Sequence, residues 1–267
     1  MLHHDAILSG NVALVLYALV LVGAAVGWRR GQWHLCYISV LVASCFKAPL
    51  LSLVVIPVLS ARRQWLPAGI TAALGGVLFA IQSLLWPSLF RGFLEAVELQ
   101  FSYNRDFGSS PSGLLSNLLF NYGVSYSLAW PLFYLLYAVP TFGLLLYLSR
   151  QFLNARLSLE QWLPVLLVGV IRLDPRIMQY DVVPITLPMV LIGWRFLAQF
   201  LPPAGAILSL ALIFAITNYT AAQDPGTWKL IEGNLLVVFF AAGCSTLLRQ
   251  SSTQSAFDHP DPLPGTD

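Results

Sequence analysis

Long apolar runs, interrupted only by short polar segments, constrain the fold of this chain more than any other feature of its sequence. Of the 267 residues, 57% are hydrophobic and only 10% are charged, and the mean hydropathy is +0.73. Soluble domains carry roughly 25% charged residues, so this composition excludes an ordinary globular protein. Because a backbone in lipid must satisfy its own hydrogen bonds, we predict an all-α, polytopic bundle of transmembrane helices.

The charge balance and the metal-binding residue types exclude several further classes. The formal net charge of +2 is too small for a nucleic-acid-binding protein. Cys36, Cys45 and Cys244 lie within apolar runs and lack the spacing of a zinc site or of a disulfide framework. The histidines lie near the N-terminus, beside Trp33 and in the tail. We therefore expect no cofactor, no protein-bound metal and no nucleic-acid partner, while a metal that bridges a substrate phosphate stays open.

Arginine pairs set the predicted membrane topology. A first span ends at Arg29-Arg30, and the next apolar stretch ends at Arg62-Arg63. One long span between these pairs would place them on opposite faces, which the positive-inside rule disfavours. We therefore predict a hairpin of two short arms that turns at Lys47. Alternation from there gives about eight to nine membrane segments, including short hairpin or re-entrant arms.

This alternation also fixes the expected location and boundaries. It places the N-terminus outside and the C-terminus in the cytoplasm. We expect the membrane to be a bacterial inner (plasma) membrane. We predict a transmembrane domain at 1–249, with an outer amphipathic loop at 87–126. The polar segment 250–267 is expected to be a disordered cytoplasmic tail, because it has no apolar period.

The outer loop begins with a segment of helical periodicity. In "PSLFRGFLEAVELQFSY" the apolar side chains recur at helical spacing, which predicts an amphipathic helix in the outer interface. That helix either shields the bundle or forms a platform beside a lateral opening through which a lipid head group enters. The following "NRDFGSSPSG" is rich in turn residues and favours a mobile loop.

The most unusual stretch is "RLDPRIMQYD", residues 172–181, which lies between apolar runs. Ionisable side chains at such a place are expensive and usually mark function. Pro175 should break the preceding helix, with Asp174 capping a new helix on which Arg176 and Tyr180 share a face. The stretch is either a salt-bridged re-entrant turn or a clamp for a phosphate. Lys47 has two matching interpretations, a snorkelling lysine or a phosphate ligand.

Three segments in this order resemble a known family: "LSGNVALVLYALVL", "SCFKAPLLSLVVIPVLSARRQW" and "DPRIMQYDVVPITLP". They contain Gly10-Asn11, Lys47 before Ala48-Pro49, Pro175-Arg176 and Tyr180-Asp181. Together they resemble the GT-C superfamily of membrane glycosyltransferases, most closely glycosyltransferase family 87, the polyprenol-phosphate-mannose-dependent mannosyltransferases. The similarity covers most of residues 8–200.

The resemblance implies a GT-C-like fold and an inverting transfer of a sugar, with mannose as the expected one. The donor is a polyprenyl-phosphate sugar at the outer face of the membrane, and the acceptor is a glycolipid or a glycan. Besides membrane lipids, these are the implied partners. The residues implied to bind the donor phosphate are Lys47, Arg172 and Arg176, and those implied to bind substrate are Asn11, Asp174 and Tyr180. Asp181 is the fallback general base.

The chain also departs from the family's pattern. Family members have a longer N-terminus, whose first outer loop carries the acidic residue expected to act as the general base. Asp5 lies too close to the first span to replace it. We therefore expect a truncated relative, or an enzyme whose missing part is a separate N-terminal polypeptide. The alternatives are a non-catalytic membrane scaffold or partner subunit, which would leave the outer charges paired with one another, and a lipid transporter.

Overall fold

The computed structural model describes most of the chain, namely residues 12–99, 108–111, 113–115, 122, 126–223 and 227–257. Within these ranges the regular secondary structure is helical, apart from one isolated parallel β-bridge between Gly108 and Ile177. The predicted all-α class is therefore confirmed for the described residues. Gly10 and Asn11, which carried part of the family resemblance, lie outside them.

Six helical stretches of the described chain are long and apolar enough to cross a membrane, which is the mark of a multi-pass membrane protein. They are Val12–Arg30, Trp65–Leu85, Pro131–Leu153, Tyr180–Leu197, Pro203–Thr220 and Lys229–Gln250. We expected about eight to nine membrane segments. The smaller number arises because three of the expected segments are short helical arms, His34–Phe46, Ala48–Ser60 and Leu159–Arg172.

The N-terminal half of the bundle contains the predicted hairpin. Its α3 arm ends at Phe46, and Lys47 follows in an extended conformation (φ −144°, ψ 94°), because Pro49 cannot continue the α-helix. Gly23 lets the first helix approach this arm, since a Cβ there would lie 2.9 Å from the Cα of Cys36. The elements of this half are α2 (Val12–Arg30), α3 (His34–Phe46), η1 (Ala48–Val54), α4 (Val55–Ser60), α5 (Trp65–Leu85) and α6 (Pro87–Glu98).

The C-terminal half holds the remaining elements. Around Pro184 and Pro188 the chain changes from a short α-helix through a 3₁₀ turn into a longer α-helix. The last helix ends at Phe257, so it enters the segment 250–267 that we expected to be disordered. The elements of this half are α8 (Tyr126–Leu153), α9 (Leu159–Arg172), α10 (Gln179–Val182), η3 (Val183–Ile185), α11 (Thr186–Leu197), α12 (Pro203–Gln223) and α13 (Thr227–Phe257).

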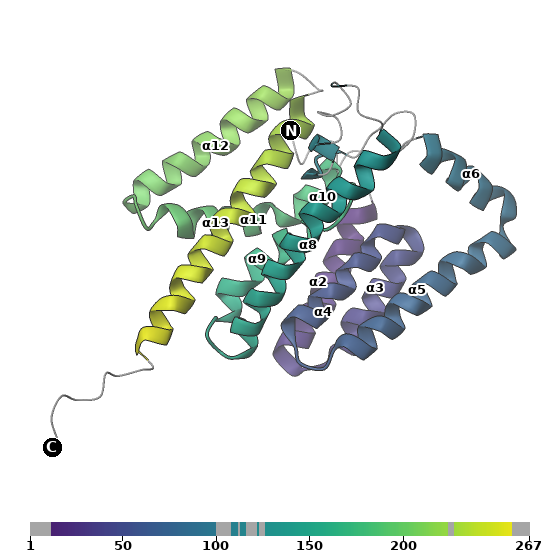
Figure 1. Ribbon diagram of the computed structural model, residues 1–267, viewed down its shortest axis with the longest axis horizontal. Helices are drawn as coiled ribbons and strands as arrows, with labels where there is room; N and C mark the ends of the chain where they lie inside the picture. The colour runs from purple at the N-terminus through teal and green to yellow at the C-terminus, as the bar shows by residue number, and fades with distance from the viewer. Residues whose placement is uncertain are drawn as a thin grey trace.

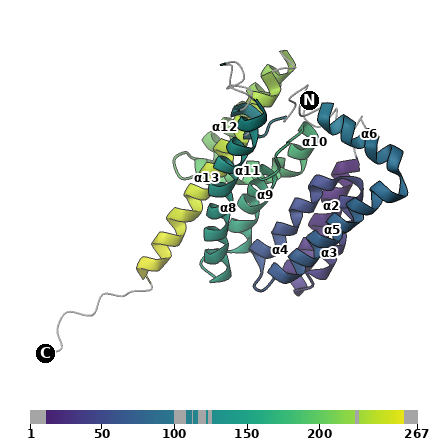
Figure 2. The same ribbon diagram turned by 45° about the vertical axis from the view of Figure 1, so that its right-hand side comes forward.

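The two halves pack side by side as two groups of helices (Figures 1 and 2), with α2 and α4 of the first group against α8, α9 and η3 of the second. Ile56, Leu59, Leu145 and Leu166 are fully buried in the core that joins them. The predicted amphipathic helix is present as α6, which leaves the far end of α5 at an angle to the bundle (Figure 1).

One end of the bundle gathers arginines. Arg62 donates to Asn154 Oδ1 at 3.3 Å, and Arg195 donates to the carbonyl of Glu160 at 2.7 Å, so the ends of α4, α8, α9 and α11 meet there. We call it the basic end, and its arginines are Arg29, Arg30, Arg62, Arg63, Arg150, Arg156, Arg195 and Arg249. The helices α3 and α9 start at this end and finish toward the opposite one.

Candidate functional site

A cluster of polar side chains lies between the two helix groups, at the end opposite the basic end. Residues far apart in the sequence meet here, because the hairpin turn at Lys47 and the segment before α10 both approach the first part of α2. We call this set the polar cluster, and it consists of Tyr17, Lys47, Asp174, Arg176, Tyr180 and Asp181.

An ion pair between Lys47 and Asp181 holds the centre of the polar cluster. Lys47 Nζ donates to Asp181 Oδ1 across 134 residues of sequence, and the two side chains are 20% and 3% exposed. The same ammonium lies 4.3 Å from the centroid of the Tyr180 ring, which is cation–π distance. The ammonium is therefore held between a carboxylate and an aromatic face.

Asp181 accepts two further hydrogen bonds. The hydroxyl of Tyr17 donates to Oδ1 at 3.4 Å, and the backbone N–H of Met178 donates to Oδ2 at 3.0 Å. The carboxylate thus faces an ammonium, a hydroxyl and an amide. This arrangement suits a carboxylate that positions neighbouring side chains. It suits a carboxylate that accepts a proton from a substrate less well.

Asp174 is the second buried carboxyl of the cluster, and its environment differs. Its Oδ1 accepts the backbone N–H of Arg176 at 3.0 Å, two residues along, in the geometry of an Asx turn. Burial raises the pKa of Asp174 to about 7, against the lowering effects of that hydrogen bond, Lys47 and Arg176, and with a further raising effect from Asp181.

Residues 174–180 do not form the predicted helix. We expected Asp174 to cap a helix that begins at Pro175, but α10 begins at Gln179, after extended backbone at Met178. Two hydrogen bonds hold the backbone out of a helical conformation. The Asp174 side chain accepts the backbone N–H of Arg176, and the carbonyl of Ile177 accepts the N–H of Ser109 at 2.7 Å. Arg176 still reaches Tyr180, because their side chains share a hydrogen bond.

The segment Gly108–Pro111 forms a strap over this extended stretch. Gly108 has a φ of +60°, and a Cβ there would lie 1.8 Å from the carbonyl oxygen of Ile177, so only glycine fits. Ser109 and Ser110 are fully buried. Backbone pairing with Ile177 gives this part of "NRDFGSSPSG", which we predicted to be a mobile loop, a defined conformation in the structure.

The strap also contacts a buried acid that the sequence analysis missed. Ser109 Oγ donates to Glu232 Oε2 at 2.9 Å, and Glu232 is only 3% exposed. Its Oε1 has no hydrogen-bond partner within the described chain. The signal that could have found it is an acidic residue within the apolar stretch Lys229–Gln250.

Arg172 was predicted to bind phosphate together with Lys47, but the structure does not bring it into the polar cluster. Its guanidinium carbon lies 4.5 Å from the Phe240 ring centroid and 5.6 Å from that of Tyr137, inside the second helix group. The residue is 6% exposed. Of the other predicted site residues, Lys47, Asp174, Arg176, Tyr180 and Asp181 do come together, and Asn11 lies outside the described residues.

The lengths of two helices place this region below the membrane surface. The α3 and α9 helices have 13 and 14 residues. At 1.5 Å per residue each rises about 20 Å, whereas a hydrocarbon core is about 30 Å thick. From the basic end, both therefore stop inside the membrane depth. Broken helices with irregular backbone at such a depth are typical of binding sites that lie within the protein.

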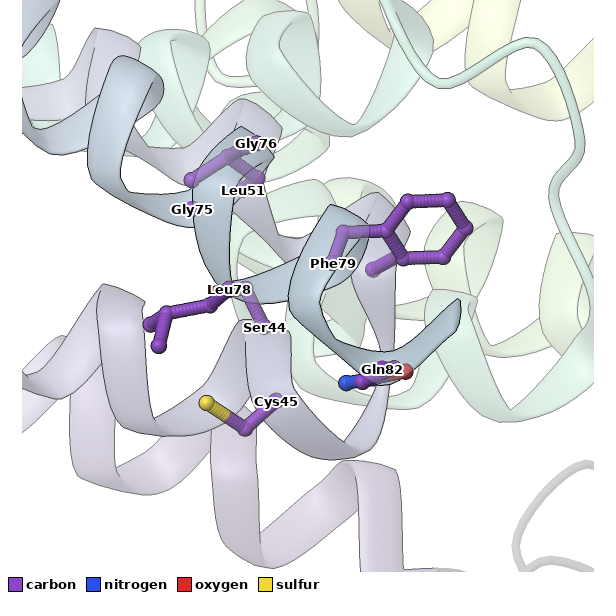
Figure 3. A pocket seen from close by; sticks show the side chains of 9 residues that line it. Ser44, Cys45, Leu51, Gly75, Gly76, Leu78, Phe79 and Gln82 are labelled. Carbon is purple, nitrogen blue, oxygen red and sulfur yellow. The ribbon is translucent and has the colours of Figure 1, made fainter. Parts of the chain in front are cut away.

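A groove opens beside the turn at Lys47 (Figure 3). It lies between α3 and α5, with Ser44 and Cys45 on one side and Phe79 and Gln82 on the other, and has a volume of about 240 Å³. A neighbouring hollow of about 280 Å³ extends it along α6. Phe46 and Ala48 line this extension, and they flank Lys47 in the sequence. The lining is mainly apolar, which suits a hydrocarbon chain.

No protein-family model, curated protein or solved structure matches the chain. The contacts of the polar cluster and the groove are therefore the basis for assigning a function.

Proposed function

We propose that the chain is a membrane glycosyltransferase, or a relative of one, that takes a sugar from a polyprenyl-phosphate donor, with mannose as the expected sugar. The observation that carries this proposal is the convergence of Lys47, Arg176, Tyr180 and Asp181 in one cluster, in which Asp181 is buried and the other three are half-buried. These residues come from the second and third of the sequence segments that resemble family 87. Cations, a phenol and carboxyls at one place are the groups that a sugar phosphate requires.

In this proposal Lys47 and Arg176 hold the donor phosphate. The phosphate becomes the partner of the Lys47 ammonium in place of Asp181, while Arg176 offers a planar fork of donors to its oxygens. As the bond from the anomeric carbon to the phosphate breaks, negative charge grows on the leaving oxygen. Preorganised cations at that position stabilise the transition state, which is usually the largest single contribution to catalysis.

Asp174 is the better general base in this site. Asp181 was the fallback candidate, but it already faces Lys47, Tyr17 and the amide of Met178. Asp174 has a pKa of about 7 because it is buried, and a base works best when its pKa lies near the working pH. Asp174 takes the proton of the acceptor hydroxyl, whose oxygen attacks the anomeric carbon and inverts it.

The groove gives the donor's hydrocarbon chain a place beside the phosphate. Its extension along α6 starts next to Lys47, and its walls are apolar side chains such as Phe79, Phe90 and Trp86. This arrangement supports the view of α6 as a platform beside a lateral opening. The acceptor is a glycolipid or a glycan.

The same proposal sets the orientation of the chain in a bacterial inner membrane. The eight arginines of the basic end favour the cytoplasmic side, so the polar cluster faces outward, with the N-terminus outside and the C-terminus inside. Polyprenyl-phosphate sugars at the outer leaflet then enter the groove from the lipid phase.

One observation favours a second candidate, a non-catalytic partner subunit of a membrane complex. Lys47 and Asp181 pair with one another, as expected for a cluster whose charges serve only the fold. The two candidates differ in whether a sugar phosphate displaces Asp181 from Lys47.

The test is binding of a short-chain polyprenyl-phosphate mannose to the detergent-purified chain. We expect saturable binding to the wild type and at least a tenfold loss in Lys47→Ala and in Arg176→Ala, since each removes a charge contact worth more than about 1.4 kcal/mol. Arg30→Ala, at the basic end, is the matched control and should bind normally. If the folded wild type does not bind the donor, the glycosyltransferase proposal is wrong and the partner-subunit proposal is favoured.

A further inference from the structure

Arg172 is a buried cation that pairs with no acid of the described residues. Its guanidinium forms no ion pair with them, and its Nε has no hydrogen-bond acceptor among them. The buried acids Asp174 and Glu232 interact with other groups: Asp174 with Lys47, Arg176 and Asp181, and Glu232 with Ser109. The immediate neighbours of the guanidinium are the rings of Phe240 and Tyr137.

The position of this cation makes the missing partner costly. Phe240 lies near the middle of the apolar stretch Lys229–Gln250, so the charge sits deep in the bundle. A buried ion loses more hydration free energy on leaving water than a cation–π contact returns. The aromatic rings therefore do not offset the cost, and intramembrane ionisable groups of this kind usually serve a ligand.

Tyr137 supplies a second polar group beside Arg172. Its hydroxyl is buried and has no hydrogen-bond partner within the described chain. The Nε of Arg172 and this hydroxyl are both hydrogen-bond donors, and neither has an acceptor among the described residues. A cation and a hydroxyl with unpaired donors in an aromatic setting suit an acceptor-rich, negatively charged occupant.

We propose that Arg172 and Tyr137 form an anion-binding site, separate from the polar cluster, that takes a phosphate group. A phosphate has three acceptor oxygens, so two can meet the planar fork of Arg172 while the third accepts from Tyr137. The phosphate comes either from a lipid head group or from free inorganic phosphate. The proposal does not depend on the proposed function, because none of the residues that bind the sugar donor there takes part in it.

The experiment measures the thermal unfolding of the detergent-purified chain against inorganic phosphate and, separately, against decyl phosphate. For the wild type we expect a saturable rise in Tm with at least one of the two. Arg172→Met should lower this rise, because only phosphate bound at the polar cluster can then contribute to it. Tyr137→Phe should weaken the apparent Kd about tenfold, since it removes one hydrogen bond to a charged group. A rise with decyl phosphate alone identifies a lipid source, and a rise with both identifies the phosphate alone as the ligand.

Two controls keep this result apart from the donor site and from misfolding. The double variant Lys47→Met/Asp181→Asn, which removes the central ion pair of the polar cluster, should keep the part of the rise that depends on Arg172. Arg172→Lys, which keeps the charge and loses the fork, should bind more weakly than wild type. An equal rise in wild type and Arg172→Met, or no rise in a folded wild type, would overturn the proposal. So would an Arg172→Met variant whose Tm without phosphate falls well below wild type, because the guanidinium would then be structural.

Discussion

Lys47 and Arg172 are two cations in similar positions with different surroundings. Each lies at the end of a short helix that starts at the basic end, and each guanidinium or ammonium faces an aromatic ring. Lys47 has Asp181 as its counter-ion, whereas no carboxylate of the described chain pairs with Arg172. A buried cation by itself therefore gives little information about function. Its partner decides whether the cation stabilises the fold or binds a ligand.

Backbone conformation explains why the two side chains diverge. Arg172 is still helical, and helical side chains lean back toward the N-terminus, so its guanidinium is directed into the bundle toward Phe240. Lys47 has already left α3 and is extended, which frees its side chain to reach across to Asp181. The two environments differ because Arg172 is the last residue of its helix, whereas Lys47 is the first residue after its own.

The largest expected effect comes from breaking the ion pair. Lys47→Met leaves the carboxylate of Asp181 buried and unpaired, which costs about 3–5 kcal/mol of unfolding free energy. Asp181→Asn alone should also be costly, while the double variant should lose much less than the sum of the two. Denaturant or thermal unfolding in detergent measures the coupling. Strictly additive losses would show that the pair contributes nothing as a pair.

Asp174 should give the next largest effect, as a pH dependence. Its pKa in the folded protein is about 7, above the ordinary value of 3.8, so the folded state holds a proton that the unfolded state has lost. The stability from this group is fully present below about pH 4 and disappears as the pH rises toward 7. Asp174→Asn, which mimics the protonated form, should flatten the profile of Tm against pH in that window. An unchanged profile in this variant contradicts the assignment of Asp174 as the titrating group.

Arg172→Met should change the free energy of unfolding in the opposite direction to Lys47→Met. Without added phosphate, methionine removes an unpaired buried charge and fills its place, so stability should stay equal or rise by about 1–4 kcal/mol. The same substitution at Lys47 should do the opposite. Unfolding experiments on Lys47→Met and Arg172→Met under the same conditions measure this difference. Equal losses of stability in the two variants would contradict the prediction.

The smallest expected effect concerns the strap. Ser109→Ala leaves the buried carboxyl of Glu232 without its donor and should cost about 1–3 kcal/mol. Ser149→Ala is the matched control: this buried serine donates to the carbonyl of Leu59 at the basic end, and its loss should cost about 1 kcal/mol. Glu232→Gln keeps a hydrogen-bonding group beside Ser109 and should cost less than Ser109→Ala. A larger loss in Ser149→Ala would indicate that the strap contact is weak.

Composition and local pattern by themselves determined the class of this protein and several of its elements. The apolar runs required helices because a backbone in lipid can satisfy its hydrogen bonds within one segment only as a helix. Proline after Lys47 fixed the hairpin turn, and helical spacing of aromatic residues fixed α6. Each of these features depends on residues within one or two helical turns, which a sequence displays directly.

Only the tertiary structure decided which charges meet. The pairing of Lys47 with Asp181 spans 134 residues, and the contact of Ser109 with Glu232 spans 123, so no local pattern records either. The strap replaced the expected helix at Pro175, since its backbone hydrogen bond to Ile177 outcompetes local helix signals. The same long-range packing separated Arg172 from Lys47, because the direction of a side chain follows from the backbone that carries it and from the neighbours that surround it.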